Sequence, residues 1–512
     1  MFCLKPLLVL IPGETPDLSR GWNYERGKGK IEVREGPRHM GCAVIAFGAM
    51  IGWGWVVSSG SWIEGGGAIG AALGFLVGGI MVFFVGRTYA ELISAMPQCG
   101  GEHVYSLKAM GPAASFVCTW AIILGYASVV CFESCTLPMI VTYVWPDFQV
   151  YYMYTIAGYD IYASQVLLAA IVAIFITYIN IRGTKVAAIV QTIFTAILAI
   201  IGILIIAGAA FSGDVANLEA QAFIGDDWGT AFNGILTVAM LSPFFFIGFD
   251  VIPQAAEEIK APLKKVGTIV LISVAMATLF YALIIVGIGL ILTPAEIEAS
   301  MAGSGLVTAD ALAKAFSSAA MSKVVLLGGL CGILTSWNAF MIGGSRAIFA
   351  MAESYMIPKA FTKLHEKYRT PVLAILLIGF LSILAPLVGR KMLVWIVDAG
   401  NFGCCLAYMM VAISFLILRK KEPDMPRPYK VSHYKLVGWI AMLMSGFMVV
   451  MYIIPGTGGS LCLEEWAMVG GWALLGVIFA LMCKKQYGDK FGQLAHVEYE
   501  NSESPEDEEA HA

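Results

Sequence analysis

The stretch AFGAMIGWGWVVSSG, residues 46–60, decides how this chain can fold. It is apolar enough to lie in a membrane, yet Gly48, Gly52 and Gly54 stand in the middle of it. A glycine in a helix interior costs roughly 1 kcal/mol relative to alanine. We therefore predict a membrane-spanning helix that is interrupted near Gly52.

A second stretch, MLSPFFFIGFDVIPQAAEEIKAP at residues 240–262, has the same character. Pro243, Gly248 and Pro253 lie around its centre. A proline removes a helical hydrogen bond and clashes with the preceding turn. This stretch is the second candidate for a discontinuous helix.

The composition around these stretches is that of a membrane protein. Of the 512 residues, 59% are hydrophobic and 13% are charged, which is about half the charge density of a soluble domain. Apolar runs of the ~20 residues that a bilayer requires recur along the chain. The sequence therefore predicts an all-α membrane protein with about twelve transmembrane helices. The expected spans are 40–60, 67–95, 111–144, 161–181, 184–211, 230–258, 265–293, 323–352, 370–389, 392–418, 435–455 and 464–483.

Positive charge is distributed unevenly over the loops between these spans. If the N-terminus is cytoplasmic, only four of the 32 Lys and Arg residues fall in outside loops, namely Lys314, Lys323, Arg390 and Lys391. Cytoplasmic loops carry the excess of Lys and Arg in membrane proteins. We therefore expect a multi-pass protein of the cell membrane with both termini in the cytoplasm.

The chain divides into three parts. Residues 1–39 lack a convincing signal peptide and are expected to form a cytoplasmic N-terminal arm. Residues 40–483 are expected to form the transmembrane domain. Residues 484–512 are acidic and poor in apolar side chains, so we expect a solvated cytoplasmic tail.

The two predicted interruptions fall at equivalent places. Residues from about 40 to 211 and from about 230 to 418 would form two halves of five helices, each beginning with an interrupted helix, and residues 435–483 would add two extra helices. Matched interruptions indicate a 5+5 inverted repeat with a binding site at the midplane of the membrane. A glycine seam for close helix packing explains either stretch alone, but for the pair we favour the binding site.

Further motifs strengthen this interpretation. They are GAMIGWG (48–54), YAELISAMPQCGGEHVYSLKAMGP (89–112), INIRGTK (179–185), FIGFDVIPQAAEEIKAP (246–262), SRAIFAMAESYMIPKAFTKLHEKYRTP (345–371) and LRKKEPDMPRPYK (418–430). With these motifs the chain resembles the amino acid–polyamine–organocation (APC) superfamily of permeases. The resemblance implies the leucine-transporter-type fold, with discontinuous helices 1 and 6 and alternating access around them.

The resemblance also implies where substrate is bound. Its α-carboxylate would meet the break in the first span and its α-amino group the carbonyls of the break in the sixth, while an aromatic side chain closes over it. The substrate-binding residues expected on this basis are Ile51, Gly52, Trp53, Gly54, Phe246, Ile247, Gly248, Phe249 and Phe340.

The chain departs from the family pattern at two places. Trp53 stands where most relatives have a small residue, and Trp55 where they commonly have Ile. An indole at the break could narrow the carboxylate pocket, or stack on a cationic or aromatic substrate. The second departure lies near Leu198 in the fifth span, where proton-coupled and some exchanger relatives carry a lysine. A lysine-based proton switch is therefore not expected.

The coupling ion is left open between H+ and Na+. In sodium-coupled relatives, hydroxyls of the eighth span and carbonyls of the first hold the cation, and Gly48, Thr335 and Ser336 stand at about those positions. Ser and Thr are also ordinary packing residues in membrane helices. Exchange without a driving ion is therefore at least as well supported.

Two acidic residues lie deep in the expected spans, where ionisable groups are costly and indicate function. Glu133 in the third span falls, by the family resemblance, on the face that lines the substrate cavity. Its carboxylate could pair with an amine or guanidinium; it could equally be protonated or bonded to a neighbouring helix. Asp250 follows the break in the sixth span, and the resemblance implies a role in gating and coupling.

The function expected is secondary-active transport of amino acids or related amines, favouring cationic substrates. The alternative is a polyamine or organic-amine permease without α-amino-acid recognition, or, less favoured, a transport-inactive substrate sensor. An enzyme is not expected, because no mid-membrane histidine is predicted. We expect no cofactor, no metal and no nucleic acid; the partners expected are the substrate, the lipid bilayer and a coupling ion.

Overall fold

The computed structural model describes residues 47–156, 159–254, 256, 262–389, 392–457 and 459–493, except for the side chains of 184–190, 263 and 392. The expected arm (1–39) and residues 494–512 of the expected tail therefore lie outside the described residues.

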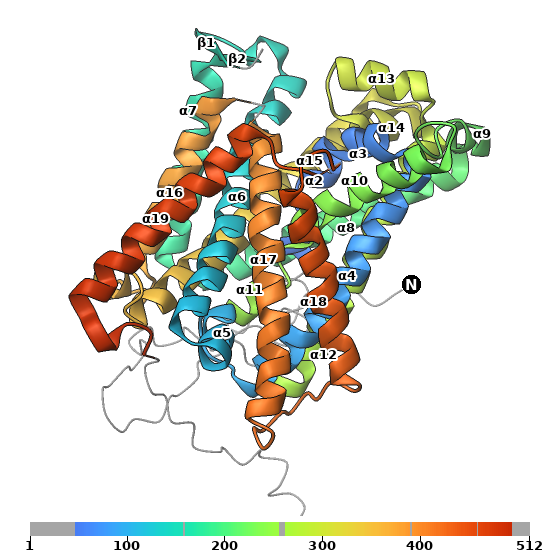
Figure 1. The fold of residues 1–512 in the computed structure, drawn as a ribbon. Helices are drawn as coiled ribbons and strands as arrows, with labels where there is room; N and C mark the ends of the chain where they lie inside the picture. The colour runs from blue at the N-terminus through green and yellow to red at the C-terminus, as the bar shows by residue number, and fades with distance from the viewer. Residues whose placement is uncertain are drawn as a thin grey trace, which may run out of the picture.

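The described chain is almost entirely helical, as predicted, and ten of its helices are long and apolar enough to cross a membrane. Figure 1 shows them as one bundle. The long helices are α4 (Ala68–Ala95), α6 (Pro112–Val144), α7 (Ala163–Arg182), α8 (Thr184–Ser212), α10 (Trp228–Phe246) continuing into α11 (Val251–Gln254), α12 (Leu263–Ile291), α15 (Ala319–Glu353), α17 (Met392–Lys421), α18 (Tyr434–Ile453) and α19 (Leu463–Tyr487).

Two of the expected spans correspond to shorter apolar helices in the described part of the chain. The first appears as the apolar segment Phe47–Val57, and the residues before Phe47 are outside the described part of the chain. The ninth appears as Val372–Val388, made of α16 (Val372–Leu384) and the 3-10 turn η4 (Ala385–Val388). The last helix runs four residues past the expected boundary at residue 483, to Tyr487.

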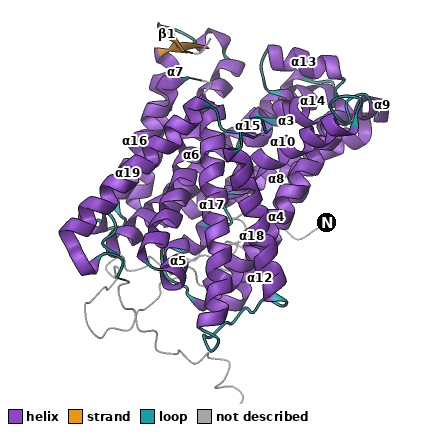
Figure 2. Cartoon of the chain, viewed as in Figure 1, coloured by secondary structure: helices purple, strands orange, loops and turns teal. Residues whose placement is uncertain are grey.

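Short elements connect the long helices. The short helices are α2 (Gly54–Val57), α3 (Ser59–Gly66), α5 (Glu102–Met110), α9 (Val215–Glu219), α13 (Pro294–Ala302) and α14 (Val307–Ala315), and the 3-10 turns are η1 (Pro146–Phe148), η3 (Lys359–Thr362) and η5 (Gly488–Lys490). Strands β1 (Tyr152–Ile156) and β2 (Tyr159–Tyr162) form an antiparallel hairpin, which the all-α prediction missed (Figure 2). We call the end of the bundle that carries this hairpin the hairpin end, and the opposite end, which carries α5, the α5 end (Figure 1).

Burial separates central from peripheral helices. In α6 the most apolar 18-residue window is 89% buried, whereas in α19 it is 17% buried. The outer helices expose large apolar side chains such as Leu167, Ile171 and Leu481. Faces of this kind are unfavourable in water and suit hydrocarbon. The bundle therefore has a protein core around α6 and a surface for lipid.

Candidate functional site

The first helix is interrupted where the glycines predict it. Phe47–Met50 is helical, Ile51–Trp53 is irregular, and α2 starts at Gly54. The Ile51 N–H still donates to the Phe47 carbonyl at 3.0 Å, and the regular pattern resumes with the Val57 N–H donating to the Trp53 carbonyl at 3.3 Å. Backbone groups between these points are released from the helix and can bind a ligand or a side chain.

The sixth span is interrupted as well, slightly later than its first proline indicates. Helix α10 continues through Pro243 and ends at Phe246, and Ile247–Asp250 form a turn before α11. Gly248 has a φ of 137°, which strongly favours glycine. A Cβ at Gly248 would lie 2.8 Å from the Met50 nitrogen, so the two breaks are in direct contact.

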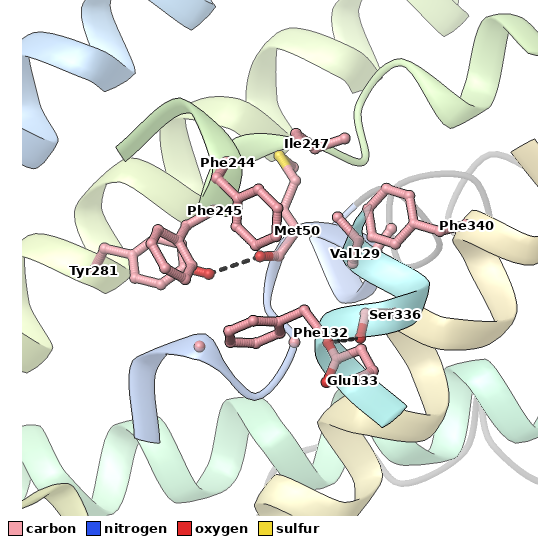
Figure 3. Close-up of a pocket in the computed structure, with 13 residues that line it drawn as sticks. Met50, Val129, Phe132, Glu133, Phe244, Phe245, Ile247, Tyr281, Ser336 and Phe340 are labelled. Atoms are coloured by element: carbon pink, nitrogen blue, oxygen red, sulfur yellow. Dashed lines mark hydrogen bonds between the residues drawn. The ribbon is translucent and has the colours of Figure 1, made fainter. Parts of the chain in front are cut away.

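A small cavity lies beside these breaks (Figure 3). Its volume is about 20 Å³, which is room for one water molecule. Side chains or helices must therefore move before a larger molecule can bind there. The lining residues are Ala49, Met50, Gly52, Gly54, Val129, Phe132, Glu133, Phe244, Phe245, Ile247, Tyr281, Ser336 and Phe340.

The residues expected to bind substrate divide into two sets. Those that the structure brings to the cavity are Gly52, Gly54, Glu133, Ile247 and Phe340. Those that are not part of its lining are Ile51, Trp53, Phe246, Gly248 and Phe249. All five of the second set are buried, so in this conformation they pack within the protein around the breaks and do not face the cavity.

Trp53 faces away from the cavity. Its ring occupies the space beside Gly329 on α15, where a Cβ on that glycine would come within 1.3 Å of the indole. Trp55 is also buried and lies edge-on to Phe280, with ring centroids 5.6 Å apart. In this state neither indole narrows the cavity, so the large side chain at the break is accommodated by a glycine on the neighbouring helix.

Glu133 is placed at the point where α6, α15 and the first break meet. The Ser336 hydroxyl donates to its Oε1, and a Cβ on Gly52 would lie 2.6 Å from that same oxygen. The residue is 2% exposed, and Oε2 has no hydrogen-bond partner within the described part of the chain. A buried carboxylate oxygen without a donor is costly, so Oε2 is able to accept a hydrogen bond at this position.

Several lining residues were not expected from the sequence. The aromatic ones are Phe132, Phe244, Phe245 and Tyr281. The Phe245 ring lies over Gly54, within 2.4 Å of the position of a Cβ there, and the Tyr281 hydroxyl donates to the Met50 carbonyl at 2.7 Å. The phenylalanine run signals an aromatic wall, but only the turn of α10 decides that Phe244 and Phe245 face the cavity while Phe246 packs on Phe75.

Asp250 lies beyond the second break, outside the cavity lining. Its carboxylate accepts from the Gly248 N–H at 2.8 Å and from the Tyr408 hydroxyl of α17 at 3.2 Å. Nearby, Gln254 donates to Glu102 at the start of α5. Burial, and then the charge of Asp250, raise the pKa of Glu102 well above its usual range. Two acids therefore lie close together between the break and the α5 end.

The residues considered for sodium are satisfied within the protein. The Thr335 hydroxyl donates to the Gly332 carbonyl at 2.9 Å. The Ser336 hydroxyl, whose one proton is shared with Glu133, also lies 2.9 Å from that carbonyl. Gly48 packs against Thr195 of α8, whose hydroxyl would lie 2.0 Å from a Cβ on that glycine. Thr195 is buried and without a hydrogen-bond partner among the described residues.

A bundle of apolar helices with two touching breaks beside a small cavity defines a class: multi-pass membrane transporters. A family model described as "Amino acid permease" matches residues 40–479. The chain belongs to this amino acid permease family, whose relatives confirm the resemblance to APC permeases.

Named relatives match most of the chain. The branched-chain amino acid permease BcaP of Bacillus subtilis (strain 168) is 26% identical over 80% of this chain and 86% of its own length. The methylthioribose transporter of the same organism is 24% identical over 83% and 90%. The cationic amino acid transporter 4 of Mus musculus is 27% identical over 75% of this chain and 59% of its own length.

Proposed function

We propose that this chain is a secondary transporter that moves amino acids or related amines across the cell membrane by alternating access. The observation that carries the proposal is the contact between the two breaks, Gly248 against Met50, beside a small cavity. Transporters of this architecture bind substrate where discontinuous helices meet. In this proposal about twelve helices form a 5+5 inverted repeat, and both termini are cytoplasmic.

The relatives leave the substrate open, because their names include branched-chain amino acids, methylthioribose and cationic amino acids. The cavity favours a positively charged substrate, since Glu133 is the charged member of its lining. Ile247 and Phe340 would contact the body of such a substrate. Ile51, Trp53, Phe246, Gly248 and Phe249 would reach it only if the breaks rearrange.

Uptake into proteoliposomes tests this proposal. The purified chain is reconstituted and offered labelled amino acids and amines, with protein-free liposomes as the control. We expect uptake or exchange of at least one compound, saturating with concentration. Absence of uptake and exchange across the whole panel contradicts a transporter, and binding without transport would indicate a substrate sensor.

We propose that Asp250 gates and couples transport. Its bonds to Gly248 and Tyr408 link the second break to α17, so protonation or rearrangement of this carboxylate would loosen that link. Asp250→Asn should reduce the dependence of uptake on a pH gradient. If uptake instead follows a sodium gradient, and Thr335→Val abolishes that dependence, the Gly48, Thr335 and Ser336 region is the coupling site.

A further inference from the structure

The charged side chains that line the cavity are of one sign, negative. Among its thirteen lining residues Glu133 is acidic, Ser336 and Tyr281 are neutral polar, and no lysine, arginine or histidine is present. A bound ammonium group would find an anion within reach. A bound carboxylate would find no side-chain cation and would have to share the cavity with Glu133. Since charges in a membrane interior need partners, the lining favours a cation over a zwitterion.

The position of Glu133 adds a second argument. Its Oε1 lies against Gly52, within 2.6 Å of the position of a Cβ there. Released backbone N–H groups at such a break are the usual place for an anionic group of a substrate. Here a carboxylate of the protein itself occupies that place, held by the Ser336 hydroxyl.

The third argument is the unused oxygen. Oε2 of Glu133 is buried in a side chain that is 2% exposed and lacks a hydrogen-bond partner in the described part of the chain. An ammonium group has three donors and no acceptor, so it can donate a hydrogen bond to this oxygen. The rings of Phe132, Phe244 and Phe340 line the same cavity and can stabilise a cation through their faces.

We propose that Glu133 binds the ammonium group of an organic amine and, by occupying the first break, disfavours a carboxylate on the neighbouring carbon. The chain then prefers an amine to the α-amino acid with the same side chain. This inference rests on the proposed transport function, which it makes more specific. The shared determinant is a primary ammonium on an apolar or cationic body.

Competition between matched pairs tests the preference. Lysine is compared with cadaverine, leucine with isoamylamine, and phenylalanine with phenethylamine, as competitors for uptake of a labelled amine into proteoliposomes. Binding of each compound to the purified full chain in detergent is measured separately by calorimetry. We expect each amine to bind and compete at concentrations about tenfold or more below its amino acid, because adjacent like charges are strongly unfavourable.

Variants of Glu133 connect the preference to this carboxylate. Glu133→Gln retains the shape and an acceptor for Ser336 but removes the charge. The ratio of the amino acid's Kd to the Kd of its amine should therefore fall toward one. Glu133→Ala also removes the carboxylate from the first break, so the amino acid should then bind more tightly than its amine. Glu465→Gln is the matched control, because Glu465 is buried on α19 and is not part of the cavity lining; its ratio should equal that of the unmodified chain.

The outcomes separate the two proposals. Amine binding without transport contradicts the transport function but supports the role of Glu133. Amino acids that bind better than their amines in the unmodified chain overturn the inference, and so does a ratio that Glu133→Gln leaves unchanged. If Glu133→Ala does not fold, the unmodified chain and Glu133→Gln still decide.

Discussion

At the scale of single residues, Gly52 carries a strict requirement for glycine. A Cβ there would lie 2.6 Å from Oε1 of Glu133 and 2.9 Å from the Ser336 hydroxyl. Its carbonyl oxygen is also close to Gly332, within 2.8 Å of the position of a Cβ on that glycine. The first break, α6 and α15 can therefore meet only because this residue has no side chain.

We predict that Gly52→Ala reduces transport without unfolding the protein. Overpacking of this kind costs about 1–3 kcal/mol, and most of the strain falls on the Glu133–Ser336 contact, so uptake should drop roughly tenfold or more. Initial uptake rates in proteoliposomes measure the effect. Gly470→Ala in α19 is the control, because a Cβ there meets no atom within 4 Å; equal uptake by both variants would show that Gly52 tolerates a methyl group.

At the scale of helices, a buried ion cluster ties α4 to α17 near the α5 end. Glu91 of α4 lies 2.7 Å from Arg419 Nε and 3.1 Å from Arg427 Nε, and it accepts from the Val431 N–H at 2.7 Å. The Glu91 side chain is 1% exposed. One carboxylate thus pairs with two arginines, which leaves the cluster with one net positive charge, and it also accepts from a backbone donor in the segment after α17.

We predict that Glu91→Gln lowers the stability of the folded protein strongly. Removing one partner leaves buried charge unpaired, which costs about 3–5 kcal/mol. Thermal unfolding of the detergent-solubilised protein measures the loss. The control is Glu422→Gln, whose partner Lys108 is 3.8 Å away and 36% exposed, and exposed pairs contribute only about 0–1 kcal/mol. Similar melting temperatures for both variants would mean that the cluster is solvated in solution.

At the scale of the whole molecule, the two ends of the bundle differ in the side chains that they carry, aromatic at one end and basic at the other. The hairpin end carries exposed tyrosines such as Tyr151 and Tyr152, which suit a membrane interface. The last turn of α17 and the loop to α18, at the α5 end, contain Lys420, Lys421, Arg427 and other basic residues. This asymmetry predicts that the hairpin end is outside the cell.

Cysteine labelling tests that orientation. In a Cys462→Ser background, chosen because Cys462 is exposed, Tyr152→Cys should react with a membrane-impermeant maleimide on intact cells. Lys420→Cys should react only after the cells are permeabilised. The opposite pattern would place the hairpin end in the cytoplasm and reverse the predicted topology.

The local pattern of the chain predicted much of this architecture. Long apolar runs determine helices, because a bilayer offers no other partner for the backbone. Glycines and prolines determine where two helices are interrupted. The β1–β2 hairpin was missed because it lies in a loop without a helical period. The positions of the breaks, at Ile51–Trp53 and Ile247–Asp250, were predicted to within a few residues.

The sequence by itself determined the class of protein, the interrupted helices and the set of aromatic and acidic residues near them. Only the tertiary structure decided how these residues are used: Gly329 takes up Trp53, and Phe244 and Phe245 form the wall instead of Phe246. It also decided that Glu133 lies against the first break. The physical reason is that helix period and residue type act locally, whereas the rotation of each helix is set by packing against distant neighbours.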